Sequence, residues 1–140
     1  EDMNASQKVE LGKLFFEDGI PGFSHLQFFQ LMQEEESPLF QIQSIEEQEV
    51  GFWVVDPFSF FPDYAFTLPD ASKEALRLGD ETQVAVFSIV TIRSEDEITV
   101  NLKAPIVVNL SNRMAKQVIL PEDTYPIRQP LFAQQAADRK

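Results

Sequence analysis

The chain has 140 residues, 44% of them hydrophobic, and a formal net charge of −12 at pH 7. This length suits one domain with its own core, so we expect residues 1–140 to form a single domain. The absence of cysteine excludes disulfides, thiolate nucleophiles and cysteine-ligated metals. The excess of acids disfavours direct binding to nucleic acids, because their phosphates need lysine and arginine.

The acids are distributed unevenly along the chain. Residues 1–50 carry eleven acids and two bases, residues 51–100 nine and three, and residues 101–140 three and six. An acidic surface of this kind suits a basic protein partner, although it is equally compatible with a role in solubility alone. No apolar run approaches the roughly 20 residues of a membrane span. The first fifteen residues open acidic, unlike a signal peptide, so we expect a cytoplasmic protein without membrane contact.

The N-terminal part of the chain predicts strands. Val9–Phe15 is a half-buried strand with its apolar side chains on the parity of Val9, Leu11 and Phe15, and a glycine- and proline-rich loop follows. Phe28–Gln33 and Leu39–Ser44 predict two strands joined by an acidic turn. Gly51–Asp56 has the aromatic and β-branched composition of a buried strand.

The C-terminal part predicts one helix and then more strands. Asp70 as N-cap and Gly79 as stop define a short helix over Ala71–Leu78, lying over a sheet or barrel end. Further strands are expected at residues 82–93, 98–103, 105–110 and 114–120, with a turn at Asn112. The pattern favours a mainly β, small β-barrel-like domain or a sandwich, with about eight short strands and one short helix. Residues 133–140 are expected to be a frayed or helical tail.

Residue types that carry catalysis or bind metal are sparse. The single histidine, His25, has no second ligand nearby in sequence, and no nucleotide-binding or serine-hydrolase motif is present. Asp56 and Asp63 border the aromatic turn, where capping of local N–H groups is a stronger interpretation than an acid/base pair. We therefore expect a binding protein without cofactor or metal, and not an enzyme.

The stretch FWVVDPFSFFPDYAF (Phe52–Phe66) has seven aromatic residues among fifteen, interrupted by two prolines. Phe52, Val54 and either Phe58 or Phe60 are expected in the core. Some of Phe58, Phe61 and Tyr64 are expected at the surface, where aromatic side chains in turns act as binding anchors.

This stretch and three others resemble the bacterial flagellar assembly factor FliW family. The others are FEDGIPGF at residues 16–23, NLKAPIVVNLSNRMAKQVIL at residues 101–120 and YPIRQPLF at residues 125–132. The resemblance covers about residues 9–132 and implies a β-barrel-like, non-enzymatic protein that is a monomer when free. It also implies two competing partners, flagellin and the basic translational regulator CsrA, which represses flagellin synthesis. Members of the family relieve that repression allosterically.

From the resemblance and the charge pattern we expect the partners to bind acidic turns and exposed aromatic side chains. The candidate partner-binding residues are Glu34, Glu35, Glu36, Glu46, Glu47, Glu49, Phe58, Phe61, Asp63 and Tyr64. An alternative is an OB-like barrel that binds single-stranded nucleic acid through a basic patch of Lys103, Arg113, Lys116 and Arg128. A hydrolase using Asp56 and Asp63 is a third interpretation.

Overall fold

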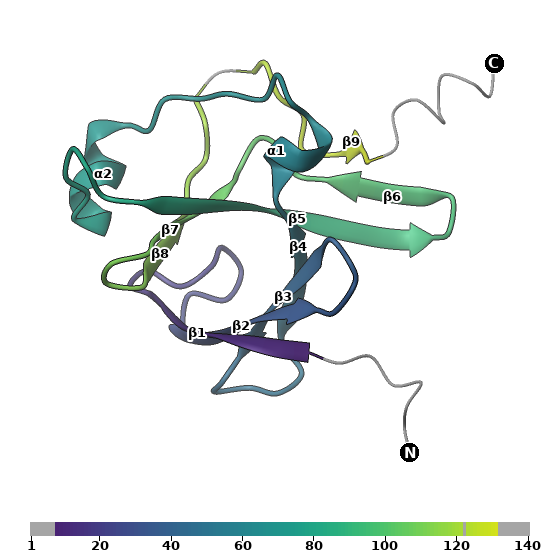
Figure 1. The fold of residues 1–140 in the computed structure, drawn as a ribbon, viewed down its shortest axis with the longest axis horizontal. Helices are drawn as coiled ribbons and strands as arrows, with labels where there is room; N and C mark the ends of the chain where they lie inside the picture. The colour runs from purple at the N-terminus through teal and green to yellow at the C-terminus, as the bar shows by residue number, and fades with distance from the viewer. Residues whose placement is uncertain (1–7, 122, 132–140) are drawn as a thin grey trace.

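A computed structural model describes residues 8–121 and 123–131, and these form a mainly β protein, as predicted (Figure 1). The strands are β1 (Lys8–Phe16), β2 (Phe28–Glu34), β3 (Leu39–Ser44), β4 (Gly51–Val55), β5 (Val84–Ser94), β6 (Glu97–Val100), β7 (Ile106–Asn109), β8 (Met114–Gln117) and β9 (Gln129–Pro130), and the helices are α1 (Pro57–Phe60) and α2 (Asp70–Leu76). Of these elements, only the short α1 and β9 were not predicted from the sequence. The predicted tail at residues 133–140 lies outside the described residues.

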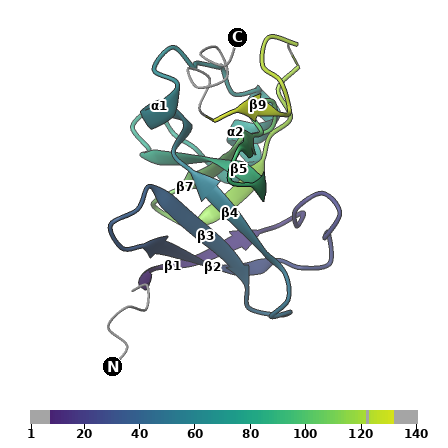
Figure 2. The same cartoon turned by 90° about the vertical axis from the view of Figure 1, so that its right-hand side faces the viewer.

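The strands close into a barrel. Their order is β4-β3-β2-β1-β8-β7-β5, and a further pairing of β4 with β5 joins the two ends of this seven-strand series among the described residues. The β1–β8 pair is parallel and the other pairs are antiparallel. The far half of β5 leaves the barrel and pairs with β6, to which β9 adds (Figure 1). Figure 2 shows β9 and both helices on the opposite side of β5 from β1, β2 and β3.

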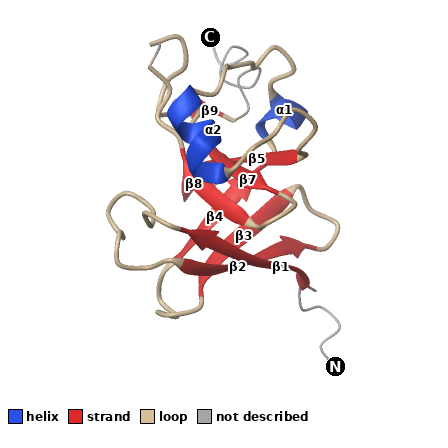
Figure 3. Cartoon of the chain, turned by 90° about the vertical axis from the view of Figure 1, so that its left-hand side faces the viewer, coloured by secondary structure: helices blue, strands red, loops and turns tan. Residues whose placement is uncertain are grey.

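Apolar side chains fill the barrel and also cover part of its outside. The interior cluster includes Phe16, Phe29, Ile42 and Phe87. Both helices and β9 lie on one side of the barrel (Figure 3), where two further clusters pack between them and the strands. All four residues of β7 are therefore buried, as are Val54 and Val55 of β4 and Phe87 and Ser88 of β5. Burial on both faces explains why consecutive residues at the end of β4 are apolar.

The predicted buried face of β1 is correct only in part. Leu11 packs against the interior cluster as expected and Val9 is exposed, but beyond Gly12 the buried side chains are Leu14 and Phe16, on the other parity from the predicted Phe15. The cause is a β-bulge against β2, where Glu10 pairs with Met32 and the next pair is Gly12 with Leu31. The extra residue shifts the alternation of faces by one, and the positive φ of 112° at Gly12 is a conformation that favours glycine.

Helix α2 also differs at both ends from its prediction. Asp70 is the first helical residue and Pro69 takes the N-cap position. The helix ends at Leu76 because Arg77 adopts a left-handed conformation with φ 59°. The predicted helix end, with Gly79 as the stop residue, was therefore too far along the chain.

Candidate interaction surface

The aromatic stretch after β4 leaves the barrel at Asp56. The Asp56 carboxylate accepts hydrogen bonds from the backbone N–H of Phe58 (2.9 Å) and the hydroxyl of Ser59 (3.3 Å), so it caps α1. Pro57 occupies the first helical turn, where its missing N–H costs no hydrogen bond. The capping interpretation of Asp56 is therefore confirmed.

The three aromatic side chains proposed as anchors lie at very different depths. Phe58 is 42% exposed, Phe61 is half-buried, and Tyr64 is only 3% exposed. The expectation that Tyr64 faces outward was wrong, because the exposed turn at Pro62 and Asp63 directs the following residue back into the protein.

Several contacts hold Tyr64 inside the protein. Its ring contacts those of Phe58, Phe66 and Tyr125, and its hydroxyl donates to the carbonyl oxygen of Leu102 at 2.7 Å. Burial, the main cause, raises the pKa of the Tyr64 phenol above its ordinary value. Tyr64 is a core residue and cannot be a docking side chain in this conformation.

A groove of about 870 Å³ lies between this stretch and β5. Phe58, Phe66 and Leu68 contribute to it from one chain segment, and Val84, Val86 and Phe87 from β5. Sequence analysis missed the contribution of β5. The length of β5 could have indicated an open edge. A strand of eleven residues cannot be covered along both edges by neighbours of four or five residues.

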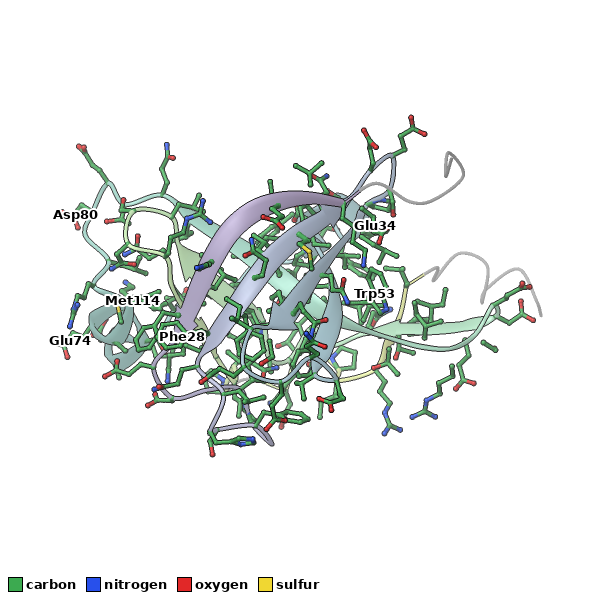
Figure 4. The ribbon with its side chains drawn as sticks, turned by 90° about the horizontal axis from the view of Figure 1, so that it is seen from below. Phe28, Glu34, Trp53, Glu74, Asp80 and Met114 are labelled. Carbon is green, nitrogen blue, oxygen red and sulfur yellow. The ribbon has the colours of Figure 1, made fainter. Side chains whose placement is uncertain are left out.

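The two glutamate clusters lie at opposite ends of the hairpin strands. Glu34–Glu36 are at the β2–β3 turn, whereas Glu46, Glu47 and Glu49 are in the β3–β4 turn. Six residues of β3 separate these turns, a span of about 20 Å. Figure 4 shows Glu34 at one end of β2 and Phe28 at the other, the end next to Glu46. The clusters are therefore two separate acidic surfaces.

The glutamates of these clusters also differ in what they contact. Glu34 lies 3.8 Å from Lys8, and Glu47 lies 3.4 Å from His25. Glu35, Glu36 and Glu49 are exposed. These three carboxylates are the ones best placed to act on a partner at long range.

Glu46 has a structural task of its own. Its carboxylate accepts the backbone N–H groups of Gln27 (2.8 Å) and Phe28 (3.0 Å), which joins the β3–β4 turn to the start of β2. The hydrogen bonds from Phe28 and Gln27 hold the pKa of Glu46 below its ordinary value.

Two of the four cations of the suggested basic patch, Lys103 and Lys116, are paired with acids. Lys103 pairs with Asp123 at 2.9 Å and lowers the pKa of that carboxyl, and Lys116 pairs with Asp18 at 3.2 Å. Arg128 is exposed. This arrangement gives little support to a continuous surface for phosphates.

No helix among residues 8–121 and 123–131 is both long enough and apolar enough to span a membrane. In the same residues no group of three or more histidine, aspartate or glutamate side chains is arranged to hold a metal ion.

The fold and its surface define a small β-barrel protein with a covering layer, an apolar groove and two acidic turns. Comparison with known proteins then identifies its family. The model of the FliW protein family matches residues 3–131. The flagellar assembly factor FliW of Caldicellulosiruptor saccharolyticus is 41% identical over 120 residues, which cover 85% of this chain and 79% of the relative. The one from Clostridium botulinum strain Okra is 37% identical over 125 residues, covering 88% and 87%.

A crystal structure of the flagellar assembly factor FliW agrees with this assignment. It matches the present structure with a TM-score of 0.83 at 40% identity, covering 88% of this chain and 87% of that chain. The chain therefore belongs to the FliW family of flagellar assembly factors.

Proposed function

We propose that this protein binds flagellin and the translational regulator CsrA alternately in the cytoplasm and catalyses no reaction. While flagellin is exported, the free protein, a monomer, binds CsrA and relieves its repression of flagellin synthesis. When flagellin accumulates, it occupies the protein, and the released CsrA stops further synthesis. Flagellin synthesis is thereby coupled to export.

The observation that carries this proposal is membership in the FliW family, and the charge distribution supports it. Residues 1–100 carry twenty acids and five bases, and Glu35, Glu36 and Glu49 present exposed carboxylates. A basic partner such as CsrA is drawn to such turns by long-range attraction. The same charge repels RNA, so the protein acts on translation through CsrA and without contacting the message.

A charge-reversal experiment tests the acidic turns. The double variant Glu35→Lys, Glu36→Lys is compared with Glu95→Lys, Glu97→Lys, which changes the net charge equally at the β5–β6 turn. Association with purified CsrA is followed by stopped-flow fluorescence at low and high salt. We expect the first variant alone to slow association more than it speeds dissociation, and high salt to reduce the difference. Equal association rates for the two variants would remove the β2–β3 turn from the proposal.

A further inference from the structure

Strand β5 has one edge that is only partly covered. On one side β6 pairs with Val90–Ser94 and β7 with Val84–Phe87. On the other side β4 pairs only with Ser88–Val90. The first four residues of β5 therefore have a strand neighbour on one edge and the apolar groove on the other.

The direction of the backbone groups in this segment follows from two hydrogen bonds. The carbonyls of Gln83 and Ile89 accept from the N–H groups of Leu110 (3.0 Å) and Asn101 (2.9 Å), on the β6–β7 side. Successive residues of a strand direct their backbone N–H and C=O groups to opposite edges. Val84 and Val86 have the other parity from Gln83 and Ile89, so their backbone groups face the groove. Among the described residues neither has a backbone partner on that side.

Pro57 explains why β4 does not cover this edge. Val54 pairs with Ile89 and Val55 with Ser88, so the same register would bring Pro57 opposite Val86. Proline has no N–H to donate, and here it opens α1, which carries the chain away from β5. The groove thus occupies the position that a longer β4 would have filled.

The shape and lining of the groove suit an extended peptide. Four residues of open strand edge span about 13 Å, enough for a strand of four or five residues. Free backbone groups supply hydrogen bonds to such a strand, and Phe58, Phe66 and Leu68 supply apolar contacts for alternate side chains.

The charges near the start of β5 define the chemistry of the peptide. Residues 78–83 contain Asp80 and Glu81 and no base. Figure 4 shows Asp80 and Glu74 at the same end of the molecule. Lys73 also lines the groove, but residues 70–83 together carry four acids and two bases, so the segment is acidic overall. A lysine or arginine on the occupant is favoured at this end, and an acid is disfavoured.

We propose that the groove between β5 and residues 58–68 binds a short extended segment of a partner protein by strand addition to Val84–Phe87. The segment has apolar side chains at alternate positions, followed by lysine or arginine beside residues 78–83. This inference rests on the proposed function in that the segment belongs to a protein partner, and it assigns the surface that holds the segment.

The first test uses a peptide probe whose sequence follows the groove. The peptide acetyl-Ser-Val-Thr-Val-Thr-Val-Lys-Arg-amide is titrated into isotope-labelled protein, with two controls: one is N-methylated at its valines, the other has two glutamates for Lys-Arg. We expect the largest NMR shifts at the Val84 and Val86 amides and about tenfold weaker binding of either control, a free-energy difference of about 1.4 kcal/mol. Shifts confined to other strands, or equal binding of all three peptides, would overturn the proposal.

Two protein variants test the groove from each side. Val84→Pro removes an N–H that faces the groove at the first residue of β5, where the β7 pairing does not use it. Phe58→Ala truncates the other side, and Phe28→Ala is its matched control, because Phe28 is 46% exposed on β2. We expect both groove variants to weaken peptide binding about tenfold or more and the control to leave it unchanged. Unchanged binding by a folded Phe58→Ala protein would contradict the proposal even if Val84→Pro fails to fold.

The same spectra separate this inference from the proposed function. Flagellin and CsrA are added in turn to the labelled protein. If they bind while the Val84 and Val86 signals stay unchanged, the groove proposal fails and the proposed function stands. If the peptide binds as expected and neither protein does, the proposed function fails and the groove stands. Protection of Val84 and Val86 by self-association without added partner would show that a second copy occupies the groove, and would also overturn the proposal.

Discussion

The hydroxyl of Tyr64 donates a 2.7 Å hydrogen bond to the backbone carbonyl of Leu102, which lies between β6 and β7. Both residues are buried, and Tyr64 also contacts Tyr125 edge to face with ring centroids 4.6 Å apart. These contacts fix the aromatic stretch over the outside of the barrel. They also fix the position of Phe58 and Phe66, which contact the Tyr64 ring and line the groove.

Removal of the Tyr64 hydroxyl tests this anchor. Tyr64→Phe leaves the Leu102 carbonyl unpaired in a buried site, so we expect a loss of about 1–3 kcal/mol in the free energy of unfolding. Tyr125→Phe is the control, because its hydroxyl accepts a hydrogen bond from the exposed Ala65 N–H, and we expect a smaller loss. Urea titration followed by fluorescence measures both. Equal losses in the free energy of unfolding would mean that the buried Tyr64 hydrogen bond stabilises the fold no more than the exposed one at Tyr125.

The β7–β8 hairpin contains two asparagines with different tasks. Asn109 is buried, donates to the Leu76 carbonyl at the end of α2 (2.8 Å) and accepts from the Ser111 N–H (2.8 Å). Asn112 is exposed, and its side-chain oxygen accepts from the Met114 N–H at 2.9 Å. The Asn112 side-chain nitrogen also donates to the Leu76 carbonyl, at a longer distance of 3.4 Å. The first asparagine therefore makes the shorter bond from the barrel to the helix, whereas the second mainly supports the turn.

Substitution of each asparagine separates these tasks. We expect Asn109→Ala to cost about 2–3 kcal/mol, since it leaves buried polar groups unpaired. Asn112→Val should cost about 1 kcal/mol, mainly through the turn, and should not change partner choice. Thermal unfolding gives both values, and hydrogen exchange of the α2 amides should rise more for Asn109→Ala than for Asn112→Val, because the Asn109 bond to Leu76 is the shorter one. A larger loss for Asn112→Val would reverse the assignment.

Gly19 and Gly22 provide a matched pair in the loop after β1. Both have positive φ, 68° and 90°. A Cβ on Gly19 would lie 2.5 Å from the Ser24 Cα, whereas a Cβ on Gly22 would meet nothing within 4 Å. We expect Gly19→Ala to destabilise by about 2 kcal/mol or more and Gly22→Ala by about 1 kcal/mol, the cost of the conformation alone. Chemical denaturation checks the order, and equal losses would show that the loop moves freely to admit the methyl group.

The carboxylate of Glu46 predicts a component of stability that depends on acid pH. Its folded pKa is lowered, so its contribution is fully present above the ordinary pKa of 4.5 and is lost as pH falls through the folded value. Glu46→Gln cannot titrate and should flatten the dependence of unfolding free energy on pH below 4.5. Glu35→Gln, at an exposed turn position, is the control and should keep the slope of the parent protein. Denaturant titrations across pH 3–6 measure the slopes, and parallel curves for the two variants would contradict the assignment.

Local pattern was sufficient for most strands of this fold. The predicted bounds of β3, Leu39–Ser44, agree with the structure, and Ile42 and Ser44 are buried on one face as its alternation indicates. The face of β1 beyond Gly12 was wrong because the bulge depends on the pairing of β1 with β2, which an alternation of period two does not contain. The turn between β7 and β8 was predicted at Asn112, but the residue with positive φ in this turn is Arg113, at 68°.

The candidate surface was harder to predict than the strands. The charge pattern was sufficient to select the two glutamate clusters as candidates. Only the fold shows that their turns lie at opposite ends of β3. The outward position of Tyr64 was wrong because its burial depends on Leu102, 38 residues away along the chain. The groove depends on the point at which β4 ends against β5, a relation between distant segments that no local pattern carries.

The most direct test of the central claim is a reconstituted translation reaction that makes flagellin from its own message. Purified CsrA is added until synthesis is repressed, then this protein, and then flagellin in excess over it. The account predicts that this protein restores synthesis and that added flagellin represses it again, whereas this protein without CsrA has no effect. Repression that persists after addition of a folded, stoichiometric amount of this protein would contradict the account.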